Sequence, residues 1–365
     1  MLIQNAKAFM DGKFQEKTDL LIRDGRISAI GTGLAAEGEE TLDLGGDLLL
    51  PGFVDVHIHA FKGMDTMQGE EAVRHMSREL KKVGVAAFLP TTMSASPEDT
   101  VKALEGIKAV MDRPEPDGAI VLGAHMEAPF LAEAKAGAQL KQYFADPNEE
   151  NWQRYTGGLE SIVRLITMAP ERAGALDFIR ELTKKGITVS IGHTTADAET
   201  THAAAEAGAT HVTHTFNAQT PLNHRAPGVP GAALVDDRLQ CEVISDGIHL
   251  HPDIVKLIIR TKGGEKLVAI TDAMEAAGMP DGQYQLGGQD VFVHEGAARL
   301  KDGTLAGSTL TMVRAFQNLM RFGATPEEAA LMTTQTPALS IGNEELGEIE
   351  LGAPAIFSRF DENYA

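Results

Sequence analysis

Apolar residues in this chain occur in short runs, and from residue 48 onwards these runs alternate with stretches in which apolar positions recur every three or four residues. A short apolar run predicts a buried strand, and recurrence at helical spacing predicts an amphipathic helix. Their alternation is typical of βα units around a parallel sheet. The predicted strands span residues 48–57, 85–91, 119–127, 162–168, 187–192, 211–214, 240–245 and 266–271.

Eight strands are the number that closes a (β/α)8 barrel, so we expect an α/β fold of the TIM-barrel type. Several predicted helices end at a glycine, as helix C-termini often do. The predicted helices span residues 70–83, 97–111, 173–185, 197–207, 252–261 and, after the eighth strand, 309–322.

The two ends of the chain follow a different pattern. Short β-like runs before residue 45 are separated by Asp-Gly and Gly-Gly pairs, which favour turns, and a final extended run covers residues 348–360. We expect residues 1–47 and 347–365 to build one small β-sandwich domain, and residues 48–346 to form the barrel. A glycine-rich β insertion is expected at about residues 283–304.

Composition narrows the class of protein. The formal net charge of −20 argues against nucleic acid or an anionic membrane as partner, although local Arg and His side chains can still hold a small anion. The sequence contains neither a basic leader nor an apolar stretch approaching about 18 residues, so we expect a cytoplasmic protein. The single cysteine, Cys241, lies in an apolar strand pattern and is interpreted as a packing residue.

Reactive side chains gather where the predicted strands end. Barrel enzymes carry their active sites at the C-terminal ends of the strands, so such positions predict catalysis. The residues at these ends are His57 and His59 for the first strand, then Glu127, His193, His214, His249 and Asp272 for the third, fifth, sixth, seventh and eighth.

Imidazoles and a carboxylate together suit Zn²⁺, Fe²⁺ or a similar cation, and three such ligands with an open position are typical of a catalytic metal site. In His57-Ile58-His59 the alternation of a strand points both imidazoles toward the barrel axis. Alone, such a pair is more often two hydrogen-bonded strand histidines. In company with Glu127, His193 and His214, we interpret both as metal ligands.

Asp272 follows the eighth strand, where a general base could take a proton from metal-activated water and return it to a leaving group. The alternative is a cap of a helix or turn. We favour the catalytic interpretation, because a metal cluster needs a partner for proton transfer. His125 and His211, on strands that carry stronger candidates, are interpreted as structural or as supports of the metal ligands.

With these residues in place, the sequence closely resembles the N-acetylglucosamine-6-phosphate deacetylases, a branch of the amidohydrolase superfamily. The resemblance runs over most of the chain, and the combination of segments is more specific than any one of them. The segments that carry it are residues 51–59, 125–130, 191–194, 214–222, 224–228, 246–249, 271–274 and 302–309.

The resemblance implies removal of acetate from N-acetylglucosamine 6-phosphate, with Glu127, His193 and His214 on the primary metal and Asp272 as acid/base. It implies a homodimer, and it leaves open whether Arg225 serves its own pocket or that of a partner subunit. Some branches lack the histidine pair, so His57 and His59 suggest a second metal position bridged by Glu127. The implied substrate contacts are Ala138, Gln139, Asn217, Ala218, Arg225, His249, Leu305, Ala306 and Gly307, of which Arg225 and His249 match phosphate-binding positions.

The sequence also departs from common family forms. Ala128 stands where a glycine usually follows the metal-binding glutamate, and Gln139 stands where one branch has a histidine that contacts the substrate. Glutamine can still hydrogen-bond a carbonyl or hydroxyl group, so we keep Gln139 as a substrate contact. The segment 352–357 differs from the usual acidic ending of the superfamily.

Two other functions remain open from sequence. Another amidohydrolase, of the D-aminoacylase or cyclic-imide hydrolase type, would act on an unphosphorylated amide. Many of those enzymes bridge two metals with a carboxylated lysine, whereas no lysine ends a predicted strand here and Glu127 offers a carboxylate directly. A non-catalytic barrel would be expected to have lost ligands or Asp272, yet the full set is present.

Overall fold

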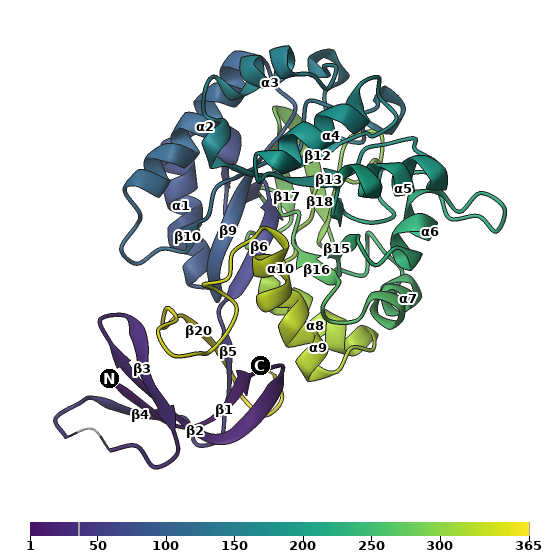
Figure 1. Ribbon diagram of the computed structural model, residues 1–365. Coiled ribbons are helices and arrows are strands. Elements are labelled where there is room, and N and C mark those ends of the chain that lie inside the picture. The colour runs from purple at the N-terminus through teal and green to yellow at the C-terminus, as the bar shows by residue number, and fades with distance from the viewer. Residues whose placement is uncertain (36, 365) are drawn as a thin grey trace.

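The computed structural model describes residues 1–35 and 37–364, and its centre is a barrel of parallel strands with helices outside it (Figure 1). The order of the strands around the barrel follows the chain, as it does in a (β/α)8 fold. The predicted fold class is confirmed. The barrel strands in the described residues are β6 (Phe53–Ile58), β9 (Val85–Thr92), β10 (Ile120–Val121) with β11 (Ala124–Met126), β12 (Val163–Met168), β13 (Thr188–Ile191), β14 (His211–Val212), β15 (Gln240–Ile244) and β16 (Leu267–Ile270).

Hydrogen bonds join β6 and the C-terminal end of β16, the first and last strands of the barrel. The buried carboxylate of Asp55 accepts hydrogen bonds from the Thr271 hydroxyl at 2.6 Å and the Thr271 N–H at 3.3 Å. The Asp272 N–H donates to the carbonyl of His57 at 2.8 Å. Burial raises the pKa of Asp55 to about 7, against the effect of these hydrogen bonds. This seam brings the histidine pair of β6 next to Asp272.

Most helices begin and end near the predicted residues, because their apolar faces recur at helical spacing. Short caps fix several starts; the Ser96 side chain accepts from the Asp99 N–H and Pro97 occupies the first turn. The predicted helices are observed as α1 (Glu70–Lys81), α2 (Pro97–Asp112), α4 (Ala175–Lys184), α5 (Ala198–Ala207), α7 (Pro252–Lys262) and α8 (Met312–Phe322).

Further short helices were not predicted. Helix α6 contains two glycines and a proline, which favour a loop, yet most of its apolar side chains, among them Val229, Ala233 and Leu234, are buried. These helices are α3 (Glu149–Thr156), α6 (Gly228–Val235), α9 (Pro326–Thr333) and α10 (Gln335–Ser340), and single 3-10 turns are η1 (Thr66–Gln68), η2 (Glu133–Lys135), η3 (Lys141–Tyr143) and η4 (Glu160–Ile162). No helix in the described residues is both long and apolar enough to cross a membrane.

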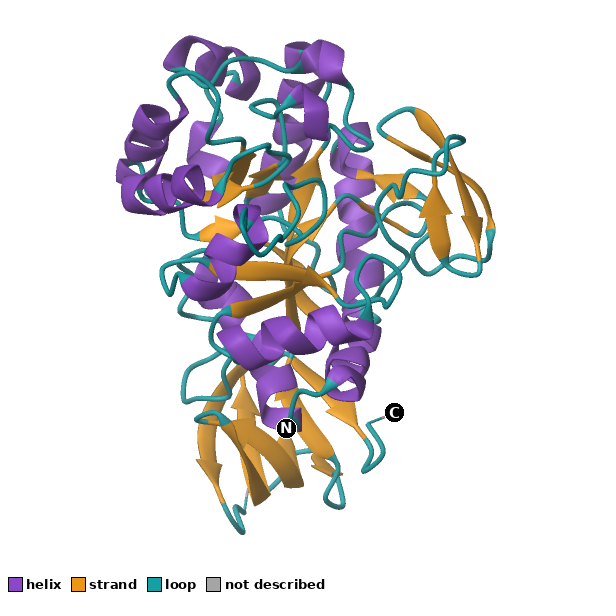
Figure 2. Ribbon diagram, turned by 90° about the vertical axis from the view of Figure 1, so that its right-hand side faces the viewer, coloured by secondary structure: helices purple, strands orange, loops and turns teal. Residues whose placement is uncertain are grey.

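Both ends of the chain meet in one sheet below the barrel (Figure 2). The expected sandwich takes the form of a single six-stranded sheet, in which β1 pairs in turn with β4 and β5. Its strands are β1 (Leu2–Met10), β2 (Lys13–Arg23), β3 (Arg26–Gly31), β4 (Thr41–Asp43), β5 (Leu48–Pro51) and β20 (Phe357–Phe360).

Strand β5 corrects the prediction for the first barrel strand. Residues 48–51 pair with β1 and β20, and the barrel strand starts only at Phe53. The break falls at Gly52, where an added Cβ would lie 2.6 Å from the Cβ of Ala86, so a larger residue could not pass this close to β9. The third and sixth barrel strands are also shorter than predicted.

The glycine-rich insertion forms a separate antiparallel sheet beside the open end of the barrel (Figure 2). Its apolar side chains, among them Leu286 and Val291, pack on Met93 and Met274 of the barrel. The Gln289 amide donates to the carbonyl of Ala138, which ties the sheet to the loop after β11. The strands are β17 (Gly282–Leu286), β18 (Gln289–His294) and β19 (Ala297–Arg299), and a hairpin of β7 (Ala60–Phe61) and β8 (Met64–Asp65) follows β6.

Candidate metal centre

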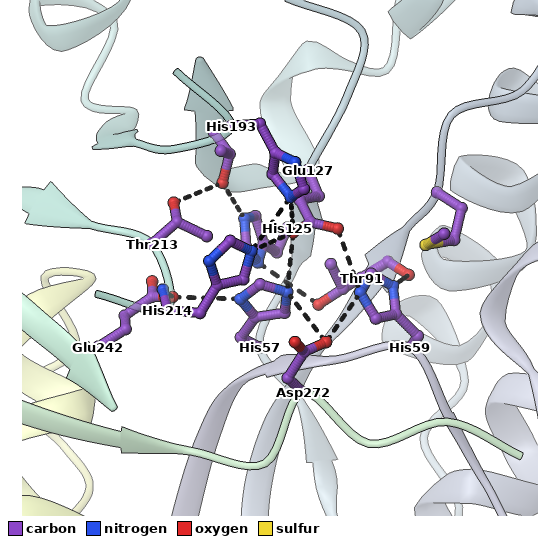
Figure 3. A network of polar contacts seen from close by, with 12 residues as sticks. His57, His59, Thr91, His125, Glu127, His193, Thr213, His214, Glu242 and Asp272 are labelled. Atoms are coloured by element: carbon purple, nitrogen blue, oxygen red, sulfur yellow. Dashed lines mark hydrogen bonds and ion pairs between the residues drawn. The ribbon is translucent and has the colours of Figure 1, made fainter. Parts of the chain in front are cut away.

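Glu127, directly after β11, lies between two pairs of histidines (Figure 3). One carboxylate oxygen, Oε1, is 3.1 Å from the Nε2 atoms of both His193 and His214. The other, Oε2, is 3.2 Å from Nε2 of His59, and Nε2 of His57 is 3.5 Å from Oε1. All five side chains are buried. Two groups of three potential ligands therefore share one carboxylate.

Left-handed backbone positions the residues that follow the strands. His193, His214 and Asp272 have φ values of 46°, 28° and 50°. For residues with a side chain this conformation costs roughly 1–2 kcal/mol, and it is found where surrounding contacts enforce it. Before His193 the chain passes so close to β14 that a Cβ on Gly192 would lie 2.6 Å from that of Thr213. In this conformation the side chains of all three residues reach the cluster around Glu127.

Hydrogen bonds select one tautomer for three of the histidines. The Nδ1 atoms of His59 and His193 lie 3.2 Å and 2.8 Å from the backbone carbonyls of Thr91 and Lys135. Nδ1 of His57 lies 3.1 Å from Oε2 of Glu242. Because these oxygens can only accept from the imidazole, Nδ1 carries a proton, and Nε2 is the nitrogen that faces Glu127 and could bind a cation. Such imidazoles are ready to bind a cation.

The charges of the cluster favour a cation. Burial alone raises the pKa of Glu127, but His57 and the hydrogen bonds from His193, His214 and His59 hold it well below its usual range. Burial also raises the pKa of Asp272, but His57 and His59 have the larger effect and lower it below the ordinary value. Burial lowers the pKa of His59, yet Asp272 and Glu127 raise it well above the ordinary value. The carboxylates therefore attract positive charge.

The donor set fits a divalent metal ion. Imidazole nitrogens with a carboxylate are ligands that Zn²⁺ and Fe²⁺ accept. In the described part of the chain, Nε2 of His57 is buried without a hydrogen-bond partner, 3.5 Å from Glu127 Oε1 and 3.7 Å from Asp272 Oδ1. A cation bound between this nitrogen and the two carboxylate oxygens would give all three atoms a partner.

A cavity of about 300 Å³ opens above the cluster, and Asp272 lies in its wall. Oδ1 of Asp272 is 3.3 Å from Nε2 of His59. The loop after β11, the segment after β14 and the insertion supply the other walls. Predicted site residues that line the cavity are His59, Glu127, Ala138, Gln139, His193, His214, Asn217, Ala218, His249, Asp272, Leu305 and Gly307.

Three predicted site residues lie elsewhere. His57 is fully buried beneath the cavity, and Ala306 is buried between two residues that line it. Arg225 is on an exposed loop, where its guanidinium donates to Nε2 of His224 at 2.8 Å. Within its own chain Arg225 is therefore not brought to the cavity.

Gln139 is held by the protein as well as exposed to the cavity. Its amide oxygen accepts the Ser94 N–H at 2.7 Å, and its amide nitrogen donates to Oε2 of Glu127. His249 is oriented in a similar way, since Nδ1 lies 2.7 Å from Oδ2 of Asp246 and Nε2 is left available. Both remain predicted substrate contacts.

Glu242 is the functional candidate that the sequence interpretation missed. It is fully buried in β15 and contacts both His57 and His211. Burial raises its pKa, but the hydrogen bonds from His211 and His57 lower it below the ordinary value. A glutamate within the apolar run 240–245 was a signal, because a charge in a buried strand needs a partner. Lys135, which lines the cavity, was also missed.

Comparison with known proteins gives matches over nearly the whole chain. The model of the amidohydrolase family matches residues 48–364. N-acetylglucosamine-6-phosphate deacetylase of Lysinibacillus sphaericus is 36% identical, with 100% of this chain and 94% of that protein covered. N-acetylgalactosamine-6-phosphate deacetylase of Escherichia coli O157:H7 is 37% identical, with 92% and 88% covered.

A solved structure matches as well. A mutant N-acetyl-D-glucosamine-6-phosphate deacetylase of Mycobacterium smegmatis, in complex with N-acetyl-D-glucosamine-6-phosphate, superimposes with a TM-score of 0.90 at 32% identity. The match covers 100% of this chain and 96% of that one. The small sheet and the insertion are thus included in the similarity.

Proposed function

The chain belongs to the amidohydrolase family and, within it, to the N-acetylglucosamine-6-phosphate deacetylases, and we propose that it hydrolyses N-acetylglucosamine 6-phosphate to glucosamine 6-phosphate and acetate. The observation that carries this proposal is Glu127 between two histidine pairs, with Asp272 beside them, at the base of a cavity. A D-aminoacylase or cyclic-imide hydrolase is less well supported, because the relatives named above act on amino-sugar phosphates.

Glu127, His193 and His214 would hold the first divalent cation, Zn²⁺ or Fe²⁺. His57 and His59 would hold a second one, with Glu127 shared between the two positions. When bound, such a cation supplies Lewis acidity, which lowers the pKa of a water ligand from about 15.7 toward 7 and polarises the acetyl carbonyl.

Asp272 moves the proton of the reaction. Its carboxylate, with a lowered pKa, accepts a proton from the water whose oxygen attacks the acetyl carbon. As the C–N bond breaks, the same carboxyl group gives that proton to the departing sugar nitrogen. No acyl-enzyme is required, in keeping with a cavity wall that offers neither a cysteine nor a serine.

The sugar phosphate would occupy the cavity above the cluster. Asp246 accepts from Nδ1 of His249, which leaves Nε2 for the cavity; when both ring nitrogens carry protons, Nε2 donates to the phosphate. Gln139 and Asn217 offer amide groups to the sugar, and their neighbours offer backbone groups. The proposed contacts are Ala138, Gln139, Asn217, Ala218, Arg225, His249, Leu305, Ala306 and Gly307.

A homodimer explains the position of Arg225. Its side chain is exposed in its own chain, so it could bind phosphate in the cavity of a second subunit. Apolar side chains are exposed nearby on the same segment, with Leu222 at 42% and Val235 at 73%. A symmetric interface over this loop would cover them.

The remaining assignments concern location and organisation. The net charge of −20 and a single buried cysteine favour a cytoplasmic enzyme without nucleic acid or membrane partners. We assign residues 1–51 and 347–365 to a small β domain and residues 52–346 to the barrel; the boundary expected at residue 47 moves to residue 51, because β5 pairs with β1 and β20.

Turnover and metal content of the purified chain test this function together. We expect deacetylation of N-acetylglucosamine 6-phosphate, a large loss of kcat/KM without the phosphate, and slower turnover of the galactosamine epimer. Metal bound without deacetylation of any amino-sugar phosphate would instead indicate a non-catalytic barrel.

Mixing two inactive variants tests the dimer. If Arg225 serves the partner's cavity, a mixture of Asp272→Asn and Arg225→Ala chains regains activity, because in mixed dimers one site receives both intact residues. If Arg225 serves its own cavity, mixing restores nothing. Light scattering of the wild-type chain measures the oligomeric state independently.

A further inference from the structure

Glu242 is a buried carboxylate that the proposed reaction does not use. It lies in the middle of β15, and its neighbours Cys241 and Val243 belong to the apolar cluster between strands and helices. Its own side chain faces the other way, into the barrel, and has no exposed surface (Figure 3). A carboxylate in such a place is costly unless both oxygens are paired.

Both oxygens are paired with histidines. Oε2 is 3.1 Å from Nδ1 of His57, and Oε1 is 3.3 Å from Nδ1 of His211. The backbone N–H of His214 also donates to Oε2, at 3.3 Å. Glu242 thus contacts residues from both histidine pairs around Glu127, from the side opposite the cavity.

The contact with His57 decides what its other nitrogen can do. A carboxylate only accepts, so Nδ1 of His57 is the donor and Nε2 is the nitrogen left for a cation. Nε2 faces the Glu127 and Asp272 carboxylates at 3.5 Å and 3.7 Å and has no hydrogen-bond partner in the described residues. His59 and His193 are oriented by backbone carbonyls, whereas His57 is oriented by a charged group. A carboxylate partner makes an imidazole a stronger metal ligand.

We propose that Glu242 is the positioning residue that creates the second cation position of His57, His59 and Glu127, by fixing His57 with its proton on Nδ1. The inference rests on the proposed function, since it concerns a cation in that site. His211 fixes the orientation of the carboxylate by occupying Oε1, which leaves Oε2 for His57. The first position, with His193 and His214, does not depend on this contact.

The alternative is that Glu242 only neutralises buried histidines. The variant Glu242→Met separates the two ideas, because it keeps a side chain of similar length but has no oxygen that could accept from Nδ1 of His57. Without that acceptor neither tautomer of His57 is selected, and Nε2 is no longer kept for a cation. Ser190→Ala is the matched control, since Ser190 is equally buried in β13 and hydrogen-bonded to Thr213 without contacting His57.

The experiment is a Zn²⁺ titration of the metal-free full chain against a chromophoric chelator, with elemental analysis of the loaded protein. We expect two ions per chain in the wild type and in Ser190→Ala. In Glu242→Met we expect the first ion at unchanged affinity and the second weakened by about 10- to 100-fold. Two ions of unchanged affinity in Glu242→Met would overturn the inference.

Two further results keep the test decisive. If Glu242→Met does not fold, as judged by circular dichroism, Glu242→Asp replaces it. Its carboxylate is one methylene shorter and loses the contact with Nδ1 of His57, so our inference requires a weakened second ion, and two ions of unchanged affinity would contradict it. A wild-type chain that binds one ion contradicts the second cation position itself. A wild-type chain that binds two ions but does not deacetylate contradicts the proposed function alone.

Discussion

His193 and His214 line the cavity, whereas His57 lies beneath it with no exposed surface. All three approach the carboxylate of Glu127. We call His193 and His214 the cavity pair, and His57 and His59 the strand pair. The cavity pair stands on left-handed loop residues after β13 and β14, while the strand pair belongs to or directly follows β6. Ligands on loops face the substrate, and ligands on a strand can be backed by the barrel interior.

The strand pair and the cavity pair differ in the groups that lie behind them, on the side away from Glu127. Behind His57 lie Glu242 and the edge of the His125 ring, whose centroid is 4.5 Å away. Behind the cavity pair, Nδ1 of His193 contacts a backbone carbonyl, and Nδ1 of His214 has no hydrogen-bond partner in the described residues. We infer that the cavity pair carries the reaction and that the strand pair tunes it.

The largest effect should follow from breaking the cavity pair. In His193→Ala we expect loss of the first ion and a fall in kcat of at least about 10³-fold, since metal catalysis contributes several kcal/mol. Elemental analysis and steady-state kinetics measure both. His294→Ala, at a side chain that is 89% exposed, is the control. Tight metal binding in His193→Ala would refute the ligand assignment.

Replacing the proton carrier should have the next largest effect. Asp272→Asn keeps the shape but cannot accept a proton, so we expect kcat to fall by about 10²- to 10⁴-fold with the first ion still bound. The pH profile of the variant should lose its acidic limb. Near-normal turnover in Asp272→Asn would show that another group carries the proton.

Breaking the strand pair should cost less. In His57→Ala we expect the second ion to be lost, the first to remain, and kcat to fall by about 10- to 100-fold, because Glu127 loses a group that orients it. The comparison with His193→Ala is the measurement of interest. Equal losses in the two variants would mean that the two sides act as one unit.

Gln139 should have a smaller effect, since it holds Glu127 through one hydrogen bond. Gln139→Met removes this bond and the one to Ser94, so we expect kcat/KM to fall by about 10-fold, or roughly 1.5 kcal/mol. Gln139→Glu should cost more, because it places a second carboxylate against Glu127. No change in either variant would remove Gln139 from both the substrate contacts and the supports of Glu127.

The smallest expected effect is the reactivity of Cys241, which lies next to Glu242 on β15 and faces the opposite side of the strand. Burial raises the pKa of the Cys241 thiol to about 11, so very little thiolate is present near pH 8. We expect a thiol reagent to leave the native protein unlabelled and to react fully after unfolding in guanidinium chloride. Rapid labelling of native protein would mean that β15 opens to solvent.

The pattern of the chain was enough for most of the fold and much of the candidate site. Strand and helix positions followed from apolar periodicity, and residues at the strand ends converged as a parallel barrel requires. Predictions were wrong where one local sequence pattern is compatible with two structures. The run 48–57 is continuous in sequence, yet Gly52 divides it between two sheets. The composition of α6 favours a loop, but the burial of most of its residues keeps it helical.

The sequence by itself determined the barrel, the candidate metal ligands and the acid/base candidate, because these depend on short-range periodicity and on which residues end each strand. Only the tertiary structure decided which nitrogen of His57 is free and that Arg225 lies outside its own cavity. The contact between His57 and Glu242 joins residues 185 positions apart. No local pattern encodes such a pairing, which exists only after the barrel has closed and leaves the single strand β16 between β6 and β15.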